Sequence, residues 1–229
     1  MSQISTESPY SISQLLLPDS IPSTVNVWQL DLNLDAGISD EDWQVLTQDE
    51  QLKAQRYHRA ADRLRFVATR AVLRRLLANR LQEVPASIEI IGGQYGKPVL
   101  KTREQPLHFS VSHSGRFALI AFSTVGAVGI DIELRALTFD IASMSAHVLS
   151  ADEAQAEQCT LDFFRRWVAK EAVLKALGLG IGEHLQSFSV WPDEEEKYEI
   201  ETALTDWPTM HTRRLYINNL YESALAWIE

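Results

Sequence analysis

Apolar and polar residues alternate or cluster in short runs along the chain, and this pattern predicts β-strands. Leu107, Phe109 and Val111 alternate with polar neighbours, which is typical of a half-buried strand. Further strands are predicted from short apolar runs at Val25–Leu32, Ile88–Ile91, Phe117–Phe122, Val128–Glu133, Phe188–Trp191, Tyr198–Ile200, Leu215–Ile217 and Ala224–Ile228. We expect the last four of these runs to form an antiparallel sheet.

Other segments repeat their apolar residues at helical spacing. A long helix is predicted from Asp62 to about Gln82, where leucines recur every three or four residues until Pro85 ends the pattern. A second helix is predicted at Asp162–Leu177, with Gly178 in the position that closes a helix. Shorter helices are expected to begin at Ser39–Asp42, Thr47–Glu50 and Ser150–Glu153, the last two as capping boxes.

This order of elements indicates how the chain is organised. Both halves run from helices into strands, which permits an α+β, pseudo-duplicated fold of two lobes. Ser123–Gly126 is the predicted boundary, so we expect an N-terminal lobe at residues 25–125 and a C-terminal lobe at 126–229. Residues 1–24 are rich in Ser, Thr and Pro and are expected to form a lead-in or an edge segment.

Composition places the chain among ordinary globular proteins. It has 229 residues, of which 45% are hydrophobic and 23% are charged, and this excludes fibrous and largely disordered classes. Cys159 is the only cysteine, so no internal disulfide can form. No apolar run approaches the ~20 residues of a membrane helix, and the N-terminus does not resemble a signal peptide. We therefore expect a cytoplasmic protein with no membrane partner.

Charge is distributed unevenly along the sequence. The net charge of −10 argues against broad, non-specific binding of nucleic acid. Yet the segment from Lys53 to Arg80 holds nine basic residues and one acidic residue, a local balance of +8. Arginine and lysine suit phosphate, so this segment indicates either an anionic ligand or a helix with a solvated basic face.

Two carboxylates in Gly129–Glu133 form the strongest chemical pattern. Alternate side chains of a strand share a face, so Asp131 and Glu133 are expected to point the same way, with Ile130 and Ile132 in the core. Their repulsion is relieved when one carboxylate takes a proton or when a cation binds between them. Oxygen ligands favour magnesium or manganese over zinc. The alternative is an acidic edge that faces solvent.

The predicted helix at Asp162–Leu177 carries the second pattern. Trp167, Glu171 and Lys175 lie on one face at a spacing of four residues. On an exposed helix, Glu171 and Lys175 would be a routine surface pair. This helix is otherwise nearly all apolar and is expected to be buried. A carboxylate that completes a metal site, followed by a lysine that contacts a phosphate, accounts for both residues.

Ser112-His113-Ser114 at a strand end is the third pattern. Neighbouring residues of a strand face opposite ways, so Ser112 and His113 are not expected to act as a nucleophile and its base. We interpret both as ligand contacts that donate to phosphate, although a structural role for His113 stays open. The sequence has no nucleophile elbow, dinucleotide fingerprint or phosphate-binding P-loop.

Together these patterns resemble the Sfp-type 4'-phosphopantetheinyl transferases, in the subgroup marked by W followed by KEA. The likeness spans roughly residues 25–228. The segments that carry it are Tyr95–Pro98, Phe109–Ser114, Gly129–Glu133, and Trp167–Ala172 with Lys175. The resemblance implies a monomer with a small antiparallel sheet packed with helices in each lobe and coenzyme A in a cleft between the lobes.

The resemblance also implies roles for particular residues. Asp131, Glu133 and Glu171 correspond to ligands of Mg²⁺, for which Mn²⁺ is an alternative, and Lys175 corresponds to the pyrophosphate contact. Residues implied to contact coenzyme A are Gly96, Lys97 and Pro98 on the adenine side, and Ser112 and His113 at the phosphates. Basic residues of the first lobe are implied at the 3'-phosphate, where Arg59 and Arg65 are candidates alongside Lys53, Arg56 and Arg63.

These expectations converge on one reaction. The protein would transfer 4'-phosphopantetheine from coenzyme A to a serine of an acyl or peptidyl carrier protein and release adenosine 3',5'-bisphosphate. Glu171 is the expected general base and Lys175 the expected stabiliser of the transferred phosphoryl group. One alternative is a magnesium-dependent nucleotide phosphodiesterase. Another is a nucleic-acid-binding protein that uses the arginine-rich helix, although we expect no nucleic-acid partner.

Overall fold

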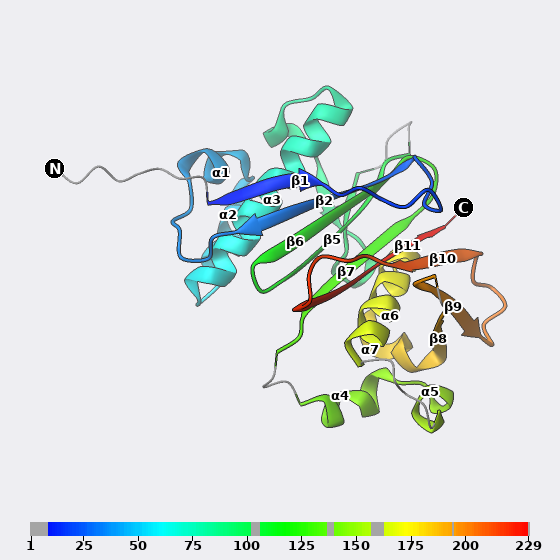
Figure 1. Ribbon diagram of the computed structural model, residues 1–229. Coiled ribbons are helices and arrows are strands. Elements are labelled where there is room, and N and C mark those ends of the chain that lie inside the picture. The colour runs from blue at the N-terminus through cyan, green and yellow to red at the C-terminus, as the bar shows by residue number, and fades with distance from the viewer. Residues whose placement is uncertain (1–8, 102–105, 137–139, 157–162, 194, 229) are drawn as a thin grey trace.

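The computed structural model describes residues 9–101, 106–136, 140–156, 163–193 and 195–228 (Figure 1). Its strands are β1 Tyr10–Gln14, β2 Val25–Leu32, β3 Ile90–Gly92, β4 Pro98–Leu100, β5 His108–Ser114, β6 Phe117–Ser123, β7 Val128–Leu134, β8 Phe188–Pro192, β9 Lys197–Thr202, β10 Met210–Arg214 and β11 Tyr221–Ile228. Its α-helices are α1 Asp40–Val45, α2 Gln48–Gln55, α3 Ala60–Leu81, α4 Ile141–Val148, α5 Ala151–Gln155, α6 Phe163–Leu177 and α7 Ile181–His184.

The strands form two main antiparallel sheets. The first has the order β1-β2-β6-β5, and the second has the order β7-β11-β10-β9-β8. β3 and β4 form a separate two-stranded ribbon. β5 is therefore an edge strand of the first sheet and β7 an edge strand of the second. The expectation of antiparallel sheets packed with helices is confirmed.

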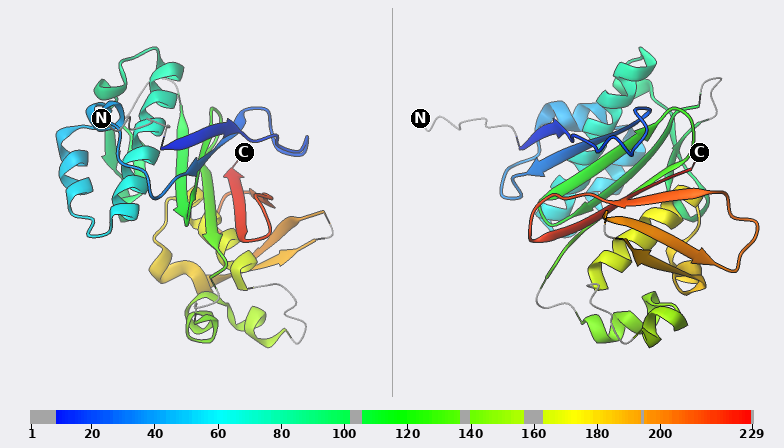
Figure 2. Two further views of the ribbon diagram at one scale, coloured as in Figure 1. Left: turned by 60° about the vertical axis from the view of Figure 1, so that its left-hand side comes forward. Right: turned by 45° about the vertical axis from the view of Figure 1, so that its right-hand side comes forward.

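Three hydrophobic clusters stack helices and sheets into layers. In the first, α3 packs on one face of the first sheet through residues such as Leu73 and Leu77. In the second, the other face of that sheet meets the second sheet, where Ile130 and Ile132 are fully buried. In the third, α6 covers the outer face of the second sheet. The order helix, sheet, sheet, helix can be followed in the two views of Figure 2.

Local signals in the sequence account for several helix ends. Both predicted capping boxes are present: the Thr47 and Ser150 hydroxyls accept from the backbone three residues on, and Glu50 and Glu153 bond back. α6 ends at Gly178, whose φ of 73° suits glycine. The predicted start of α6 at Asp162 lies outside the described residues. No helix in the described ranges has the length and apolar character needed to cross a membrane.

The structure corrects several predicted elements. The strand expected at Leu215–Ile217 is instead β10, which ends at Arg214. Charged residues masked this strand in the sequence, because Arg214 is half-buried and pairs with the buried Glu222 of β11. The helices α4 and α7 were not predicted. Residues 1–24 were expected to form a lead-in or an edge segment, and within them β1 pairs with β2 along the edge of the first sheet.

Candidate active site

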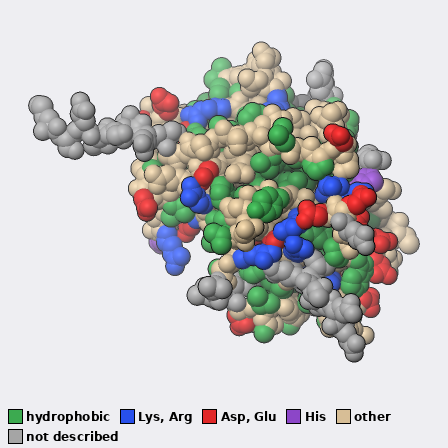
Figure 3. All heavy atoms as spheres, viewed as in Figure 1, with side chains coloured by type: hydrophobic (Ala, Val, Ile, Leu, Met, Phe, Trp, Pro, Cys, Tyr) green, Lys and Arg blue, Asp and Glu red, His purple; other side chains and the backbone are tan. Residues whose placement is uncertain are grey.

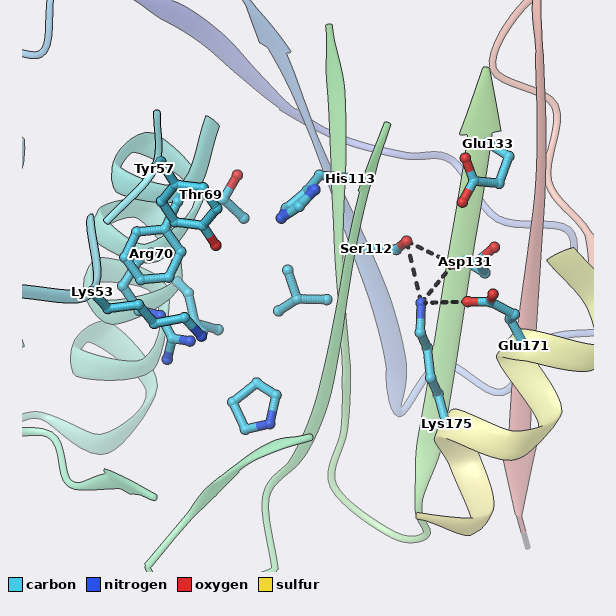
Figure 4. A pocket seen from close by; sticks show the side chains of 14 residues that line it. Lys53, Tyr57, Thr69, Arg70, Ser112, His113, Asp131, Glu133, Glu171 and Lys175 are labelled. Atoms are coloured by element: carbon cyan, nitrogen blue, oxygen red, sulfur yellow. Dashed lines mark hydrogen bonds and ion pairs between the residues drawn. The ribbon is translucent and has the colours of Figure 1, made fainter. Parts of the chain in front are cut away.

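A cavity of about 310 Å³ lies between α3 and α6, with β5 crossing its middle (Figure 4). Its lining comes from both halves of the chain. The residues that line it are Lys53, Tyr57, Phe66, Thr69, Arg70, Leu73, Pro98, Val111, Ser112, His113, Asp131, Glu133, Glu171 and Lys175. Eight of the residues predicted for the site are therefore brought together: Lys53, Pro98, Ser112, His113, Asp131, Glu133, Glu171 and Lys175.

The carboxylates reach this cavity from two elements. Asp131 and Glu133 project from the same face of β7, while the intervening Ile132 is buried between the sheets, as the strand period predicts. Glu171 projects from α6, which packs against β7. Asp131 is 1% exposed and Glu171 is 8% exposed. Three carboxylates from two elements thus share a largely buried space.

Lys175 lies among these carboxylates. Its Nζ is 2.5 Å from Asp131 Oδ1 and 3.5 Å from Glu171 Oε2, and it also donates to Ser112 Oγ at 3.3 Å. The Trp167 indole Nε1 donates to the other oxygen of Glu171 at 2.5 Å. The tryptophan and lysine, one helical turn before and after Glu171, together orient its carboxylate.

Burial and mutual repulsion shift the proton affinities of these groups. Burial, followed by the charge of Asp131, raises the pKa of Glu133 to about 7 and that of Glu171 to about 7. Burial lowers the pKa of Lys175, but the charges of Asp131 and Glu171 outweigh it, so the pKa is raised overall. Lys175 therefore stays charged, while one ammonium compensates only part of the negative charge of three carboxylates.

One buried oxygen also lacks a partner. Asp131 Oδ2 is shielded from solvent and makes no hydrogen bond within the part of the chain that the structure describes. An orphaned carboxylate oxygen beside two further carboxylates has the chemistry of a site for a hard divalent cation. Among the described residues, however, no three such side chains are already gathered closely enough to hold a metal ion. The donor set fits a cation, and the Lys175 ammonium lies between two of its members.

The two predicted contacts on β5 point to opposite sides of that strand (Figure 4). Ser112 faces β7 and its hydroxyl donates to Asp131 Oδ1 at 2.7 Å. His113 faces α3, and burial, the largest cause, lowers its pKa. This arrangement agrees with the expectation that Ser112 and His113 do not form a nucleophile and base. It places a hydroxyl near the carboxylates and an imidazole toward the basic side of the cavity.

Gly96 and Lys97 lie beside this cavity and do not line it. They line an adjacent cavity of about 240 Å³, which Pro98 and Lys175 also border. The Lys97 ammonium donates to the backbone oxygens of Val128, at 3.1 Å, and Lys175, at 2.5 Å. Burial and the charge of Lys175 lower the pKa of Lys97 to about 8. The sequence did not predict that this side chain would bridge the two halves of the chain.

Only some of the predicted basic residues of the first half line the cavity. Arg59 is exposed at the start of α3, and neither it nor Arg65 lines either cavity. Arg65 donates to Gly115 O at 2.9 Å and pairs with Asp62 at 2.6 Å. Lys53 and Arg70 are the basic residues of this region that reach the cavity.

Much of the local positive charge in this region is compensated by acidic residues that lie outside it in sequence. Glu50 forms two bonds to the buried Arg74, at 2.7 and 3.0 Å, and lies 3.5 Å from Arg70. Arg75 pairs with Asp42 at 2.5 Å. On the face shown in Figure 3, acidic and basic side chains are likewise interspersed. Arg74 and Arg75 thus contribute to packing, a role that the count of charges did not predict.

Sequence reasoning also missed the wall opposite the carboxylates. Tyr57, Phe66 and Thr69 line the cavity from the α3 side. Phe66 contacts both basic residues: Lys53 Nζ lies 5.2 Å from its ring centre and the Arg70 guanidinium carbon lies 5.8 Å from it. The four-residue spacing of Phe66 and Arg70 on one helix was the only sequence signal for this pair.

Comparisons with known proteins identify the family of the chain. The model of the 4'-phosphopantetheinyl transferase superfamily matches residues 127–222, and the model of the 4'-phosphopantetheinyl transferase N-terminal region matches residues 39–125. The transferase HetI of Nostoc sp. is 32% identical over 78% of this chain and 78% of its own length. A candidate 4'-phosphopantetheinyl transferase of Synechocystis sp., slr0495, is 36% identical over 68% of this chain and 65% of its own length.

A third relative is the 4'-phosphopantetheinyl transferase Sfp of Bacillus subtilis, which is 28% identical over 65% of this chain and 67% of its own length. The two family models adjoin without overlap, and the three carboxylates and Lys175 fall within the superfamily model at residues 127–222. The chain belongs to the 4'-phosphopantetheinyl transferase superfamily.

Proposed function

We propose that the protein transfers the 4'-phosphopantetheine group of coenzyme A to a serine of an acyl or peptidyl carrier protein. The observation that carries this proposal is the buried set of Asp131, Glu133, Glu171 and Lys175 in one cavity, in a chain of the transferase superfamily. The reaction forms a bond from the serine oxygen to the phosphorus nearer the pantetheine. It breaks the bond from that phosphorus to the bridging oxygen, which leaves as part of adenosine 3',5'-bisphosphate.

We propose Asp131, Glu133 and Glu171 as the residues that hold Mg²⁺, with Mn²⁺ as a second ion that the same oxygens fit. The unpartnered Oδ2 of Asp131 and the raised pKa values of both glutamates support this assignment. A bound divalent ion would supply neutralisation of charge on the pyrophosphate.

The side chains of α6 would handle the proton and the transferred group. Glu171 is the proposed base for the serine proton; in the protein without a bound cation, burial and the charge of Asp131 raise its pKa to about 7. The Trp167 N–H holds one Glu171 oxygen in place. Lys175, which keeps its charge, would stabilise the phosphoryl oxygens during transfer.

Residues of β5 and of the wall opposite the carboxylates would bind coenzyme A. Pro98, Ser112 and His113 line the cavity, and Lys53 and Arg70 add positive charge to its far wall. Gly96 and Lys97 border the adjacent cavity and stay candidates for the adenine side. Arg59 and Arg65 stay predictions for the 3'-phosphate, since both lie on or beside α3. The charge of Arg65 acts on His113, which supports its proximity to the site.

The broader expectations stay predictions. We propose two lobes that divide at residues 123–126, with coenzyme A bound between them, in a cytoplasmic monomer. The division follows the two sheets, because β6 is the last strand of the first sheet and β7 the first strand of the second.

Product analysis tests the proposal against a phosphodiesterase. The protein is incubated with coenzyme A and Mg²⁺, with and without an apo carrier protein, and nucleotides are separated by chromatography. We expect adenosine 3',5'-bisphosphate to be released only when the carrier is present, in amounts equal to the carrier modified. Release at the same rate without a carrier would identify a diesterase and overturn the proposal.

A further inference from the structure

Three serines on β5 form a regular set of contacts with β7. They alternate along the strand, so their hydroxyls share one face. Each hydroxyl oxygen accepts a hydrogen bond from a backbone N–H of β7. The three bonds are Ile130 N to Ser110 Oγ at 3.1 Å, Ile132 N to Ser112 Oγ at 3.4 Å, and Leu134 N to Ser114 Oγ at 3.0 Å.

The spacing of these contacts defines how the two sheets meet. Each donor lies 20 residues after its acceptor, and a constant offset over three steps means that β5 and β7 run parallel and in register. Each is the edge strand of its own sheet. The serine hydroxyls therefore supply the acceptors that a neighbouring strand would otherwise provide for these edge N–H groups.

Two of these hydroxyls also hold carboxylates. Ser112 Oγ donates to Asp131 Oδ1 at 2.7 Å, and Ser114 Oγ donates to Glu133 Oε2 at 2.8 Å. An ionised carboxylate can only accept, so the single hydrogen of each hydroxyl is donated to the carboxylate, while the hydroxyl oxygen accepts from the backbone N–H. The two bonds together hold each hydroxyl between β7 and its carboxylate.

Ser110 completes the pattern without a carboxylate. The residue that corresponds to Asp131 and Glu133 at this step is Gly129. An added Cβ there would lie 1.9 Å from Ala172 O, so α6 packs directly on the backbone of β7 at this point. Ser110 thus shares the structural bond of the other two serines and lacks their contact with the carboxylates.

We propose that Ser114 is a positioning residue that orients Glu133 for binding of a divalent cation. The inference rests on the proposed function of the three carboxylates. The Ser114 hydroxyl, itself held by the Leu134 N–H, donates to one oxygen of the Glu133 carboxylate and so fixes its orientation. Ser114 belongs to the first half of the chain and Glu133 to the second, so the contact also couples the carboxylate to the seating of β5 against β7.

The test compares Ser114→Ala with its internal control, Ser110→Ala. Binding of Mn²⁺ and of Mg²⁺ to the protein alone is measured by isothermal titration calorimetry, and stability is measured by urea unfolding. We expect both variants to lose some stability, because each leaves a backbone N–H without its acceptor. Only Ser114→Ala is expected to bind the cations more weakly, by about 10-fold. Ser114→Thr, which keeps a hydroxyl, is expected to restore binding.

Equal cation affinity in the two alanine variants, or no cation binding to the unaltered protein, would overturn the inference. Should Ser114→Ala fail to fold, Ser114→Cys replaces it, because a thiol keeps the size of the side chain and donates weakly. Calorimetry needs neither coenzyme A nor a carrier protein. Weaker cation binding by Ser114→Ala in a protein that transfers nothing would support the positioning role while the proposed function fails.

Discussion

At the scale of single residues, the chemistry of the site follows from where carboxylates are buried. The two-residue period of a strand predicted that Asp131 and Glu133 share a face, and the spacing of α6 predicted that Glu171 and Lys175 do. The structure brings these residues into one cavity. The contacts that reach the site from other elements were not predictable. The bond from the Ser114 hydroxyl to Glu133, and the bonds from the Lys97 ammonium to backbone oxygens, depend on how separate elements meet, which no local pattern encodes.

The raised pKa values predict how stability depends on pH. In the folded protein, Glu171 keeps its proton up to about pH 7, whereas its ordinary value is 4.5. The folded state therefore binds more protons than the unfolded state between these values. The free energy of unfolding must then fall as pH rises through this window. We expect Glu171→Gln to remove on the order of 2 kcal/mol of that fall.

Urea unfolding at pH 5 and pH 7.5, in the presence of a chelator, measures this effect. The quantity of interest is the difference between the unaltered protein and Glu171→Gln, since other groups also titrate. The exposed Glu199, changed to Gln, serves as the control and should leave the pH dependence unchanged. A pH dependence in Glu171→Gln equal to that of the unaltered protein would contradict the assignment of a raised pKa.

At the scale of elements, propensity and capping signals predicted most helices and strands because these signals are local. The structure departs from them where tertiary contacts decide. β10 was misplaced because Arg214 is stabilised in the sheet by Glu222, a partner on the next strand. The sequence of α3 is rich in basic residues, which is typical of an exposed helix. Arg74 is nevertheless only 1% exposed, because Glu50 of α2 pairs with it.

Because α6 packs directly on β7 at Gly129, a side chain at this position is expected to destabilise the fold. A Cβ at this position would lie 1.9 Å from Ala172 O and 2.5 Å from Ala176 N, both backbone atoms of α6. We expect Gly129→Ala to displace α6, to lower the free energy of unfolding by about 1–3 kcal/mol, and to reduce transfer, because α6 carries Glu171 and Lys175. Thermal unfolding and transfer assays measure both. Gly37→Ala is the control, since no atom lies within 4 Å of its added Cβ.

A buried charge cluster between α5 and α6 predicts a loss of stability when its single carboxylate is removed. Glu153 of α5 is fully buried, with Lys170 Nζ 2.6 Å from one oxygen and Arg166 Nη1 3.1 Å from the other. Glu153→Gln would leave two buried cations without a countercharge, and we expect a loss of about 3–5 kcal/mol.

Urea unfolding measures this loss against a surface control. Glu195→Gln removes an ion pair with Lys197 in which both side chains are largely exposed. We expect it to change the free energy of unfolding by about 0–1 kcal/mol. Similar losses in the two variants would contradict a structural role for the buried cluster.

At the scale of the whole molecule, the fold of antiparallel sheets and helices and the superfamily were both predictable from the sequence. The wall of Tyr57, Phe66 and Thr69 was not, because it depends on how α2 and α3 face β7 across β5. The same holds for the separation of Arg59 and Arg65 from the cavity. Sequence periodicity describes one element at a time, whereas the cavity is shared by several elements that lie far apart along the chain.

Mass spectrometry of an intact apo carrier protein, after incubation with the protein, coenzyme A and Mg²⁺, tests the central claim most directly. We predict that the carrier gains one phosphopantetheine group with the unaltered protein. With Asp131→Ala we predict that the rate falls by at least about 100-fold, although the thermal unfolding of this variant stays cooperative. The exposed Asp206, changed to Ala, should leave the rate unchanged. Near-normal modification of the carrier by folded Asp131→Ala would contradict the assignment of the buried carboxylates as the transfer site.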